Sequence, residues 1–121
     1  MLKAENRLRK RQDFHRIYKR GISFVASGMV LYIRKNNNAH FRVGFSVSKK
    51  VGKAVKRNKV KRRLRHIARN LSASFCQGFD YIFIARPSLI YLPYDKQVEQ
   101  MTFLLNKAQK KRCENGVEKN G

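Results

Sequence analysis

The residues with the clearest chemical character in this 121-residue chain are the Lys and Arg residues at positions 49–65. Ten of these seventeen positions are Lys or Arg, and the 66 residues that separate Asp13 from Asp80 contain no carboxylate. Because the chain cannot neutralise this segment itself, the phosphates of a polyanion are the expected counter-charge. The formal charge of the whole chain, +22, also indicates a nucleic-acid partner.

Apolar residues recur through this segment at helical spacing, which predicts a helix with two distinct stripes. The apolar stripe consists of Val60, Leu64, Ile67, Ala68, Leu71 and Phe75. The polar stripe, roughly opposite, consists of Asn58, Lys61, Arg62, Arg65 and Arg69. An ordinary solvated face is the alternative, but such faces usually mix signs, whereas like charges one turn apart cost a few tenths of a kcal/mol per pair. The pattern therefore favours a helix that packs on a sheet and binds phosphate.

A loop of small and basic residues precedes this helix. It contains Ser46, Ser48, Lys49, Lys50, Gly52 and Lys53. Helix N-termini attract anions, so we expect this loop to contact backbone phosphate. The Walker spacing GxxxxGK[ST] is absent, which disfavours nucleotide hydrolysis.

The other reactive side chains do not form a recognisable catalytic pattern. The seven acids are scattered, and His15, His40 and His66 fall on different expected elements without an evident carboxylate partner. Cys76 and Cys113 lack the spacing of a zinc site or a disulfide framework. If the chain serves an enzyme, we expect another component to supply the chemistry. With no apolar run near the roughly 18 residues of a membrane span, we expect a cytoplasmic protein that binds no membrane.

Aromatic residues could form a second binding surface. Phe14 and Tyr18 are four residues apart on an expected helix, and Tyr32 lies on a strand face opposite Leu31 and Ile33. Gly44 and Ser46 share the outer face of another expected strand, so together these residues could form a groove. Two interpretations stay open: ordinary core packing, or a platform on which unpaired bases stack, worth about 1–3 kcal/mol per base.

Periodicity predicts the elements that position these groups. We expect helices at 8–20, through the basic segment and at 94–111, and strands at 22–26, 29–34, 40–47 and 79–86. Gly21 is expected to end the first helix in the left-handed conformation. The order α-β-β-β-α-β-α predicts an α+β or α/β two-layer sandwich, with a small mixed sheet and a parallel βαβ crossover. Residues 1–111 form the single expected domain, and 112–121 an expected disordered tail.

Residues 45–65, FSVSKKVGKAVKRNKVKRRLR, closely resemble the signature of the bacterial ribonuclease P protein family. Residues 13–21, 30–33 and 80–86 are similar to other recurrent segments of that family, so the resemblance covers roughly residues 5–111. Lys59 stands where the family's Arg-Asn-Arg motif usually has its second arginine, and His66 where an acid commonly follows. Lys59 can still neutralise a phosphate as a point charge, without the bidentate geometry of arginine.

The resemblance implies a subunit that assists removal of the 5′ leader from precursor tRNA, with the active site and its Mg²⁺ held mainly by a large RNA and no cofactor bound tightly by the protein. The implied partners are ribonuclease P RNA, with one protein per RNA, and precursor tRNA, without a small-molecule substrate. The expected RNA-binding residues are Ser48, Lys49, Lys50, Lys53, Lys56, Arg57, Asn58, Lys59, Lys61, Arg62, Arg65 and Arg69. The expected leader cleft consists of Phe14, Tyr18, Tyr32, Arg34, Gly44 and Ser46.

The resemblance also implies a left-handed crossover between the parallel strands, against the usual right-handed rule. The alternative function is that of a structural RNA-binding protein of the ribosomal type, which would carry similar charge but take no part in a cleavage reaction.

Overall fold

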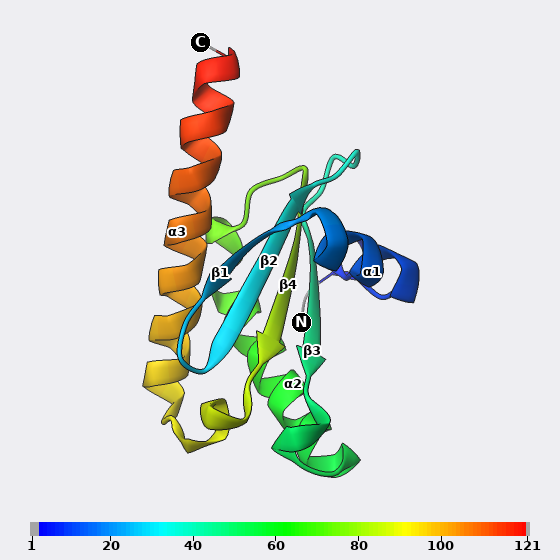
Figure 1. Ribbon diagram of the computed structural model, residues 1–121, viewed down its shortest axis with the longest axis vertical. Helices are drawn as coiled ribbons and strands as arrows, with labels where there is room; N and C mark the ends of the chain where they lie inside the picture. The colour runs from blue at the N-terminus through cyan, green and yellow to red at the C-terminus, as the bar shows by residue number, and fades with distance from the viewer. Residues whose placement is uncertain (1–2, 121) are drawn as a thin grey trace.

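A computed structural model describes the backbone of residues 3–120 and the side chains of residues 3–110 (Figure 1). Its helices and strands are α1 (Arg11–Arg20), β1 (Ile22–Val25), β2 (Met29–Lys35), β3 (Arg42–Val47), α2 (Ala54–Asn70), β4 (Phe79–Ala85) and α3 (Tyr94–Asn120). Short 3-10 turns precede α1 and connect several of the other elements. The predicted order of elements and the α+β class are confirmed.

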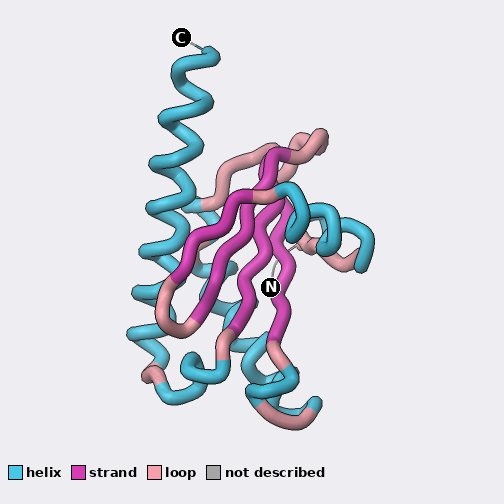
Figure 2. Tube along the Cα trace, viewed as in Figure 1, coloured by secondary structure: helices cyan, strands magenta, loops and turns pink. Residues whose placement is uncertain are grey.

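The four strands form one mixed sheet in the order β1-β2-β4-β3 (Figure 2). β2 is antiparallel to both β1 and β4, whereas β3 and β4 are parallel, so α2 is the connection of the predicted βαβ crossover. Figure 1 shows β3 and β4 running downward, with α2 behind the sheet and β4 to the left of β3. That arrangement makes the crossover left-handed, as the resemblance implies.

The larger core lies between the sheet and the two helices α2 and α3. It contains Leu31, Phe83 and Leu64, which are fully buried. Alternate residues of the same strands point to the other face, where Ile82 packs with Leu8 and with Ile17 of α1. The sheet therefore has α2 and α3 on one face and α1 on part of the other, which leaves the rest of that second face open.

The start of α1 differs from the sequence prediction. The helix begins at Arg11, because residues 7–8 are extended: the Leu8 N–H donates to the Val43 carbonyl at 2.9 Å and Arg7 forms a parallel bridge with Val43. Gly21 was also predicted wrongly, since its φ of −79° is not left-handed. Glycine is required there by close approach: an added Cβ would lie 2.6 Å from the Ile17 oxygen.

Two further boundaries differ from the prediction. α2 ends at Asn70, so Phe75 is not on the helix, although it is buried and stacks on Phe41 with ring centroids 5.0 Å apart. α3 continues beyond Lys111 to Asn120, across the segment expected to be a disordered tail. Arg112, Glu114, Glu118 and Lys119 of this segment favour helix and no proline interrupts it, whereas Gly116 disfavours helix. Gly121 lies outside the described residues.

Candidate nucleic-acid interface

The two predicted stripes of α2 are present. Leu64, Ile67 and Ala68 are buried in the larger core, with Val60 and Leu71 partly buried beside them. The polar stripe divides in two, because Lys61 and Arg65 are half-buried whereas Asn58, Arg62 and Arg69 are exposed. The N-terminal two turns of α2 contain no acidic residue, so its cations have no carboxylate nearby on the helix.

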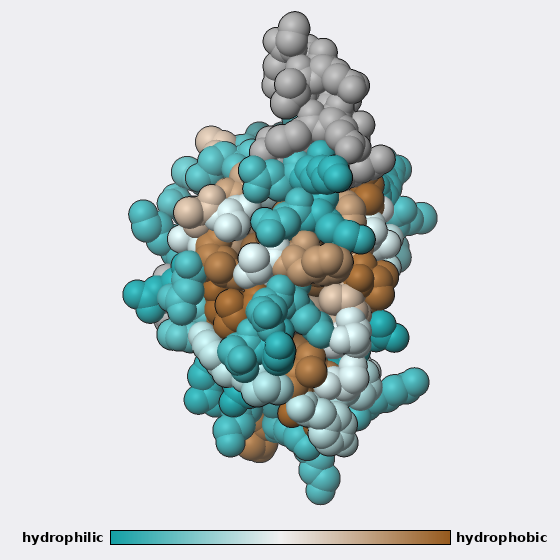
Figure 3. Space-filling model, turned by 90° about the vertical axis from the view of Figure 1, so that its left-hand side faces the viewer, coloured by the Kyte–Doolittle hydropathy of each residue, from teal (hydrophilic) through white to brown (hydrophobic). Residues whose placement is uncertain are grey.

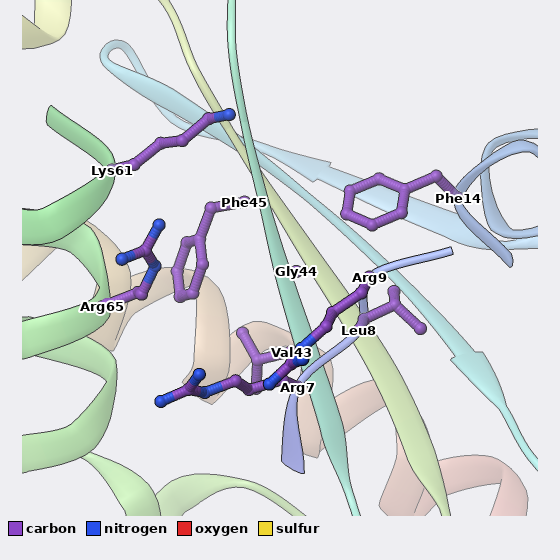
Figure 4. Close-up of a pocket in the computed structure, with 9 residues that line it drawn as sticks. All are labelled: Arg7, Leu8, Arg9, Phe14, Val43, Gly44, Phe45, Lys61 and Arg65. Carbon is purple, nitrogen blue, oxygen red and sulfur yellow. The ribbon is translucent and has the colours of Figure 1, made fainter. Parts of the chain in front are cut away.

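Lys61 and Arg65 lie at the edge of the sheet beside β3. Together with Phe14 of α1 they line one pocket, which passes around the outer edge of β3 at Gly44 and Phe45 (Figure 4). This pocket connects the cations of α2 to the aromatic residues on the far face of the sheet. The cationic helix and the aromatic residues, predicted as two separate surfaces, therefore meet at one site.

Arg7 and Arg9 also line this pocket, although the sequence did not predict them as site residues. The extended segment at residues 7–8 pairs with β3 and so places both arginines at the sheet edge (Figure 4). The basic N-terminus was visible in the sequence, but its pairing with a strand more than thirty residues away has no local signal. The pocket thus has four cationic side chains, two from each side of β3.

The aromatic residues form a continuous cluster. Tyr18 makes edge-to-face contacts with both Phe14 and Tyr32, with ring centroids 6.2 and 5.2 Å apart. Phe14 and Tyr32 are partly buried against Ile17 and Ile82, whereas 36% of Tyr18 is exposed. The cluster therefore packs on a small core, as the first interpretation expects, and presents one partly exposed ring.

Gly44 and Ser46 lie beside this cluster on the open face of β3. The Phe14 ring rests directly on Gly44, where a Cβ would clash with the ring. Burial raises the pKa of the Tyr18 hydroxyl, an effect opposed by its hydrogen bond with Ser46 and increased by nearby Tyr32. Tyr18 is therefore neutral at physiological pH and can lie close to a phosphate without charge repulsion.

Arg34 is the one predicted cleft residue placed elsewhere. It pairs in register with Asp80 and lines a different pocket, with Lys10, Arg16 and Arg42. Both carboxylate oxygens of Asp80 are already bound by Arg42, and its Oδ1 also accepts from Asn36. No carboxylate among the described residues pairs with Arg34, so its charge is available in that pocket.

The loop before α2 is compact. The Ser48 hydroxyl accepts from the Lys50 N–H at 3.1 Å, and Arg57 donates to the Gly52 carbonyl at 3.0 Å. The other predicted basic residues of the loop and first turns are exposed, namely Lys49, Lys50, Lys53, Lys56 and Lys59. The hydrogen bonds of Ser48 and Arg57 hold the loop backbone, and these cations are exposed to solvent.

The described part of the chain has no group of three or more His, Cys, Asp or Glu side chains that could hold a metal ion. His15, His40 and His66 lie on α1, in the loop before β3 and on α2, as separate residues. Cys76 is a half-buried free thiol, whereas the side chain of Cys113 is outside those described. No helix within residues 3–120 is both long and apolar enough to cross a membrane.

Comparisons with known proteins agree on one family. The family model described as ribonuclease P matches residues 2–109. A ribonuclease P protein component of Streptococcus pneumoniae is 40% identical over 118 residues, which cover 98% of this chain and 96% of that protein. Solved structures of the RNase P proteins of Staphylococcus aureus and Thermotoga maritima match with TM-scores of 0.77 and 0.76 and identities of 36% and 35%. These alignments cover 85% and 84% of this chain, and 94% and 96% of those chains.

Proposed function

The chain belongs to the ribonuclease P protein family, which acts in the ribonuclease P holoenzyme, and from this premise we propose which partner each of its surfaces binds. The exposed cations of α2 and of the preceding loop bind the catalytic RNA. The aromatic cluster and the pocket at the β3 edge bind the single-stranded 5′ leader of precursor tRNA. The protein thereby assists endonucleolytic removal of the leader to give the mature 5′ end.

The observation that carries this proposal is the pocket shared by Phe14, Lys61 and Arg65. A single strand needs a flat face for its bases and cations for its phosphates, and this pocket supplies both within one hollow. The exposed Tyr18 ring extends the stacking surface from Phe14 towards Tyr32. A double helix would not enter such a pocket, because its bases are already stacked.

The outward residues of α2 suit a different contact. Arg62 and Arg69 are exposed on a helix whose opposite side is fixed in the core by Leu64 and Ala68. Arginine forks on a rigid helix can bind phosphate oxygens in a set orientation. We propose that this side of α2, together with the neighbouring Asn58 and Lys59, binds the folded catalytic RNA.

The proposal places the chemistry in the RNA. Hydrolysis of a phosphodiester by Mg²⁺ requires oxygen ligands for the metal, which RNA phosphates supply. The cations of α2 would act on the phosphates around such a site by orienting them and by reducing their mutual repulsion. No residue of the chain is proposed to hold Mg²⁺ tightly or to transfer a proton.

Reconstitution tests this proposal. Purified protein added to a ribonuclease P RNA should raise the rate of precursor tRNA cleavage at low Mg²⁺, where repulsion between phosphates is greatest. The protein alone should not cleave the precursor. Absence of stimulation, with an RNA that is active by itself at high Mg²⁺, would contradict the proposal. It would favour the alternative, a structural RNA-binding protein of the ribosomal type. Cleavage by rigorously purified protein alone would show that the chemistry was wrongly assigned.

A further inference from the structure

α1 carries a second cationic surface that the proposed function does not use. Its outer side forms a shallow hollow lined by Arg11, Arg16, Lys19 and Arg20, with Gln12 and His15 between them. A second hollow shares Gln12 and Arg16 with the first and continues to Lys10 and Arg34. We call the two hollows together the α1 surface. Eight Lys or Arg residues line it, against two carboxylates.

The two carboxylates do not neutralise this surface. Asp80 is buried, and both of its oxygens accept hydrogen bonds from Arg42 at 2.7–2.8 Å. Asp13 is only 14% exposed and lies 3.5–3.6 Å from Arg42 and Arg16. Within the described chain no carboxylate pairs with the remaining cations of the α1 surface, which are Lys10, Arg11, Lys19, Arg20, Arg34 and Lys35.

These cations are held in place rather than spread over a mobile segment. Ile17 is buried beneath α1, and Phe14 rests on the sheet at Gly44, so the helix is fixed on its inner side. Arg16 and Arg20 are one helical turn apart, and like charges at that spacing destabilise a helix by a few tenths of a kcal/mol. An anionic partner would remove this repulsion.

α1 and α2 lie on opposite faces of the sheet (Figure 1). Ile82 points towards α1 and its neighbour Phe83 towards the α2 side, so the whole sheet separates the two cationic helices. A partner bound on the outward side of α2 cannot also cover the α1 surface without passing around the sheet. The protein thus has two separate cationic surfaces, one on each side of the sheet.

We propose that the α1 surface binds the sugar–phosphate backbone of the ribonuclease P RNA, so that this RNA contacts the protein on both faces of its sheet. The inference rests on the proposed function above. The leader is a poorer candidate, because it is assigned to the aromatic cluster and the β3 pocket, whereas the imidazole of His15 is the only ring among the residues that line the outer side of α1. A row of cations on a rigid helix suits the regularly spaced phosphates of folded RNA.

The test compares two variants of the full chain that each remove three positive charges. The first is Arg11→Gln, Lys19→Gln, Arg20→Gln on the α1 surface. The second, a matched control on α3, is Lys96→Gln, Lys107→Gln, Lys110→Gln. Binding to ribonuclease P RNA without substrate is measured over a series of salt concentrations. A parallel arm measures precursor tRNA binding to the holoenzyme at saturating protein.

In the first arm, log affinity should fall less steeply with log salt for the α1 variant than for the wild type. The magnitude of the slope should decrease by roughly two to three, because about one counter-ion fewer is released for each lost contact. The α3 control should keep the wild-type slope. Thermal unfolding should show both variants folded, since every substituted residue is exposed. Equal slopes for the α1 variant and the control would overturn the proposal, as would a loss confined to precursor tRNA binding. Failure of wild-type protein to bind the RNA would instead contradict the proposed function itself.

Discussion

Arg42 donates two hydrogen bonds to Asp80 across the parallel strands β3 and β4, from Nε to Oδ1 at 2.8 Å and from Nη2 to Oδ2 at 2.7 Å. The two residues are register partners, and the pair lies beneath the N-terminal turn of α1, where Arg42 also approaches Asp13. Hydrogen bonds to Asp80 raise the pKa of Arg42. One guanidinium therefore joins two strands to the helix that carries Phe14 and Tyr18.

Loss of the Arg42 side chain should destabilise the fold. In Arg42→Gln the carboxylate of Asp80, whose side chain is 7% exposed, loses its charged partner. We expect the free energy of unfolding to fall by about 2–4 kcal/mol, measured by urea denaturation. The exposed Arg63→Gln is the charge-matched control and should change stability by less than about 0.5 kcal/mol. Because the chain is strongly cationic, removal of any positive charge reduces repulsion. Equal stabilisation by both variants would mean that this effect is larger than the contribution of the Arg42–Asp80 pair.

Removal of the exposed ring should weaken binding of the leader. Tyr18→Ala in the holoenzyme should reduce affinity for precursor tRNA by about 5- to 150-fold, the equivalent of one stacked base. Affinity for mature tRNA should not change, since it has no leader. Tyr18→Phe keeps the ring and should retain most of the affinity. Equal losses for precursor and mature tRNA would favour a purely structural role for the cluster.

The two halves of the α2 polar stripe should separate by function. Lys61→Gln with Arg65→Gln should weaken precursor binding more than RNA binding, because both residues line the pocket with Phe14. Arg62→Gln with Arg69→Gln should weaken binding of the catalytic RNA. It should also reduce the magnitude of the slope of log affinity against log salt by roughly two. The two pairs serve as controls for each other, since each removes two charges from one helix. Identical profiles would show that α2 has a single undivided surface.

Contact between Gly44 and Phe14 should appear as coupling in a double-mutant cycle. Gly44→Ala places a methyl group where the Phe14 ring rests, so we expect a loss of about 1–3 kcal/mol in stability and weaker precursor binding. Phe14→Ala leaves room for that methyl group, so Gly44→Ala should cost much less stability in the Phe14→Ala background. Additive losses would show that the ring moves aside freely.

The sequence was sufficient for those features that depend on local periodicity. The apolar stripe of α2 was identified because Leu64, Ile67 and Ala68 recur at helical spacing. Alternation along the strand expected at 40–47 correctly placed Gly44 on the outer face, where the Phe14 ring rests. The division between core side and exposed side of both elements was thus predictable.

Features that depend on strand order were not predictable in the same way. Arg34 and Tyr32 share a strand face, yet Arg34 lies opposite Asp80 and lines the pocket with Lys10 and Arg16, whereas Tyr32 contacts Tyr18 in the aromatic cluster. Pairing of residues 7–8 with β3 brought Arg7 and Arg9 to the site. Such non-local contacts leave no periodic signal in either segment.

The side of the molecule formed by α3 and β1 differs from the two cationic helices. Its surface mixes polar and apolar side chains (Figure 3), and α3 begins with Asp95, Lys96 and Glu99, which include a 3.1 Å ion pair. This mixture of signs is the ordinary pattern of a solvated helix. It makes α3 the natural location for control substitutions in RNA-binding experiments.

The position of β4 determines when the protein can fold during synthesis. β4 is the last strand to leave the ribosome, yet it lies between β2 and β3 and forms the inner pairings of the sheet. Until residues 79–85 emerge, the β1–β2 hairpin is the only strand pair in the described chain that can form, and an isolated hairpin is marginally stable. The nascent chain therefore exposes its densely cationic segment without the completed sheet against which α2 packs until residues 79–85 have emerged.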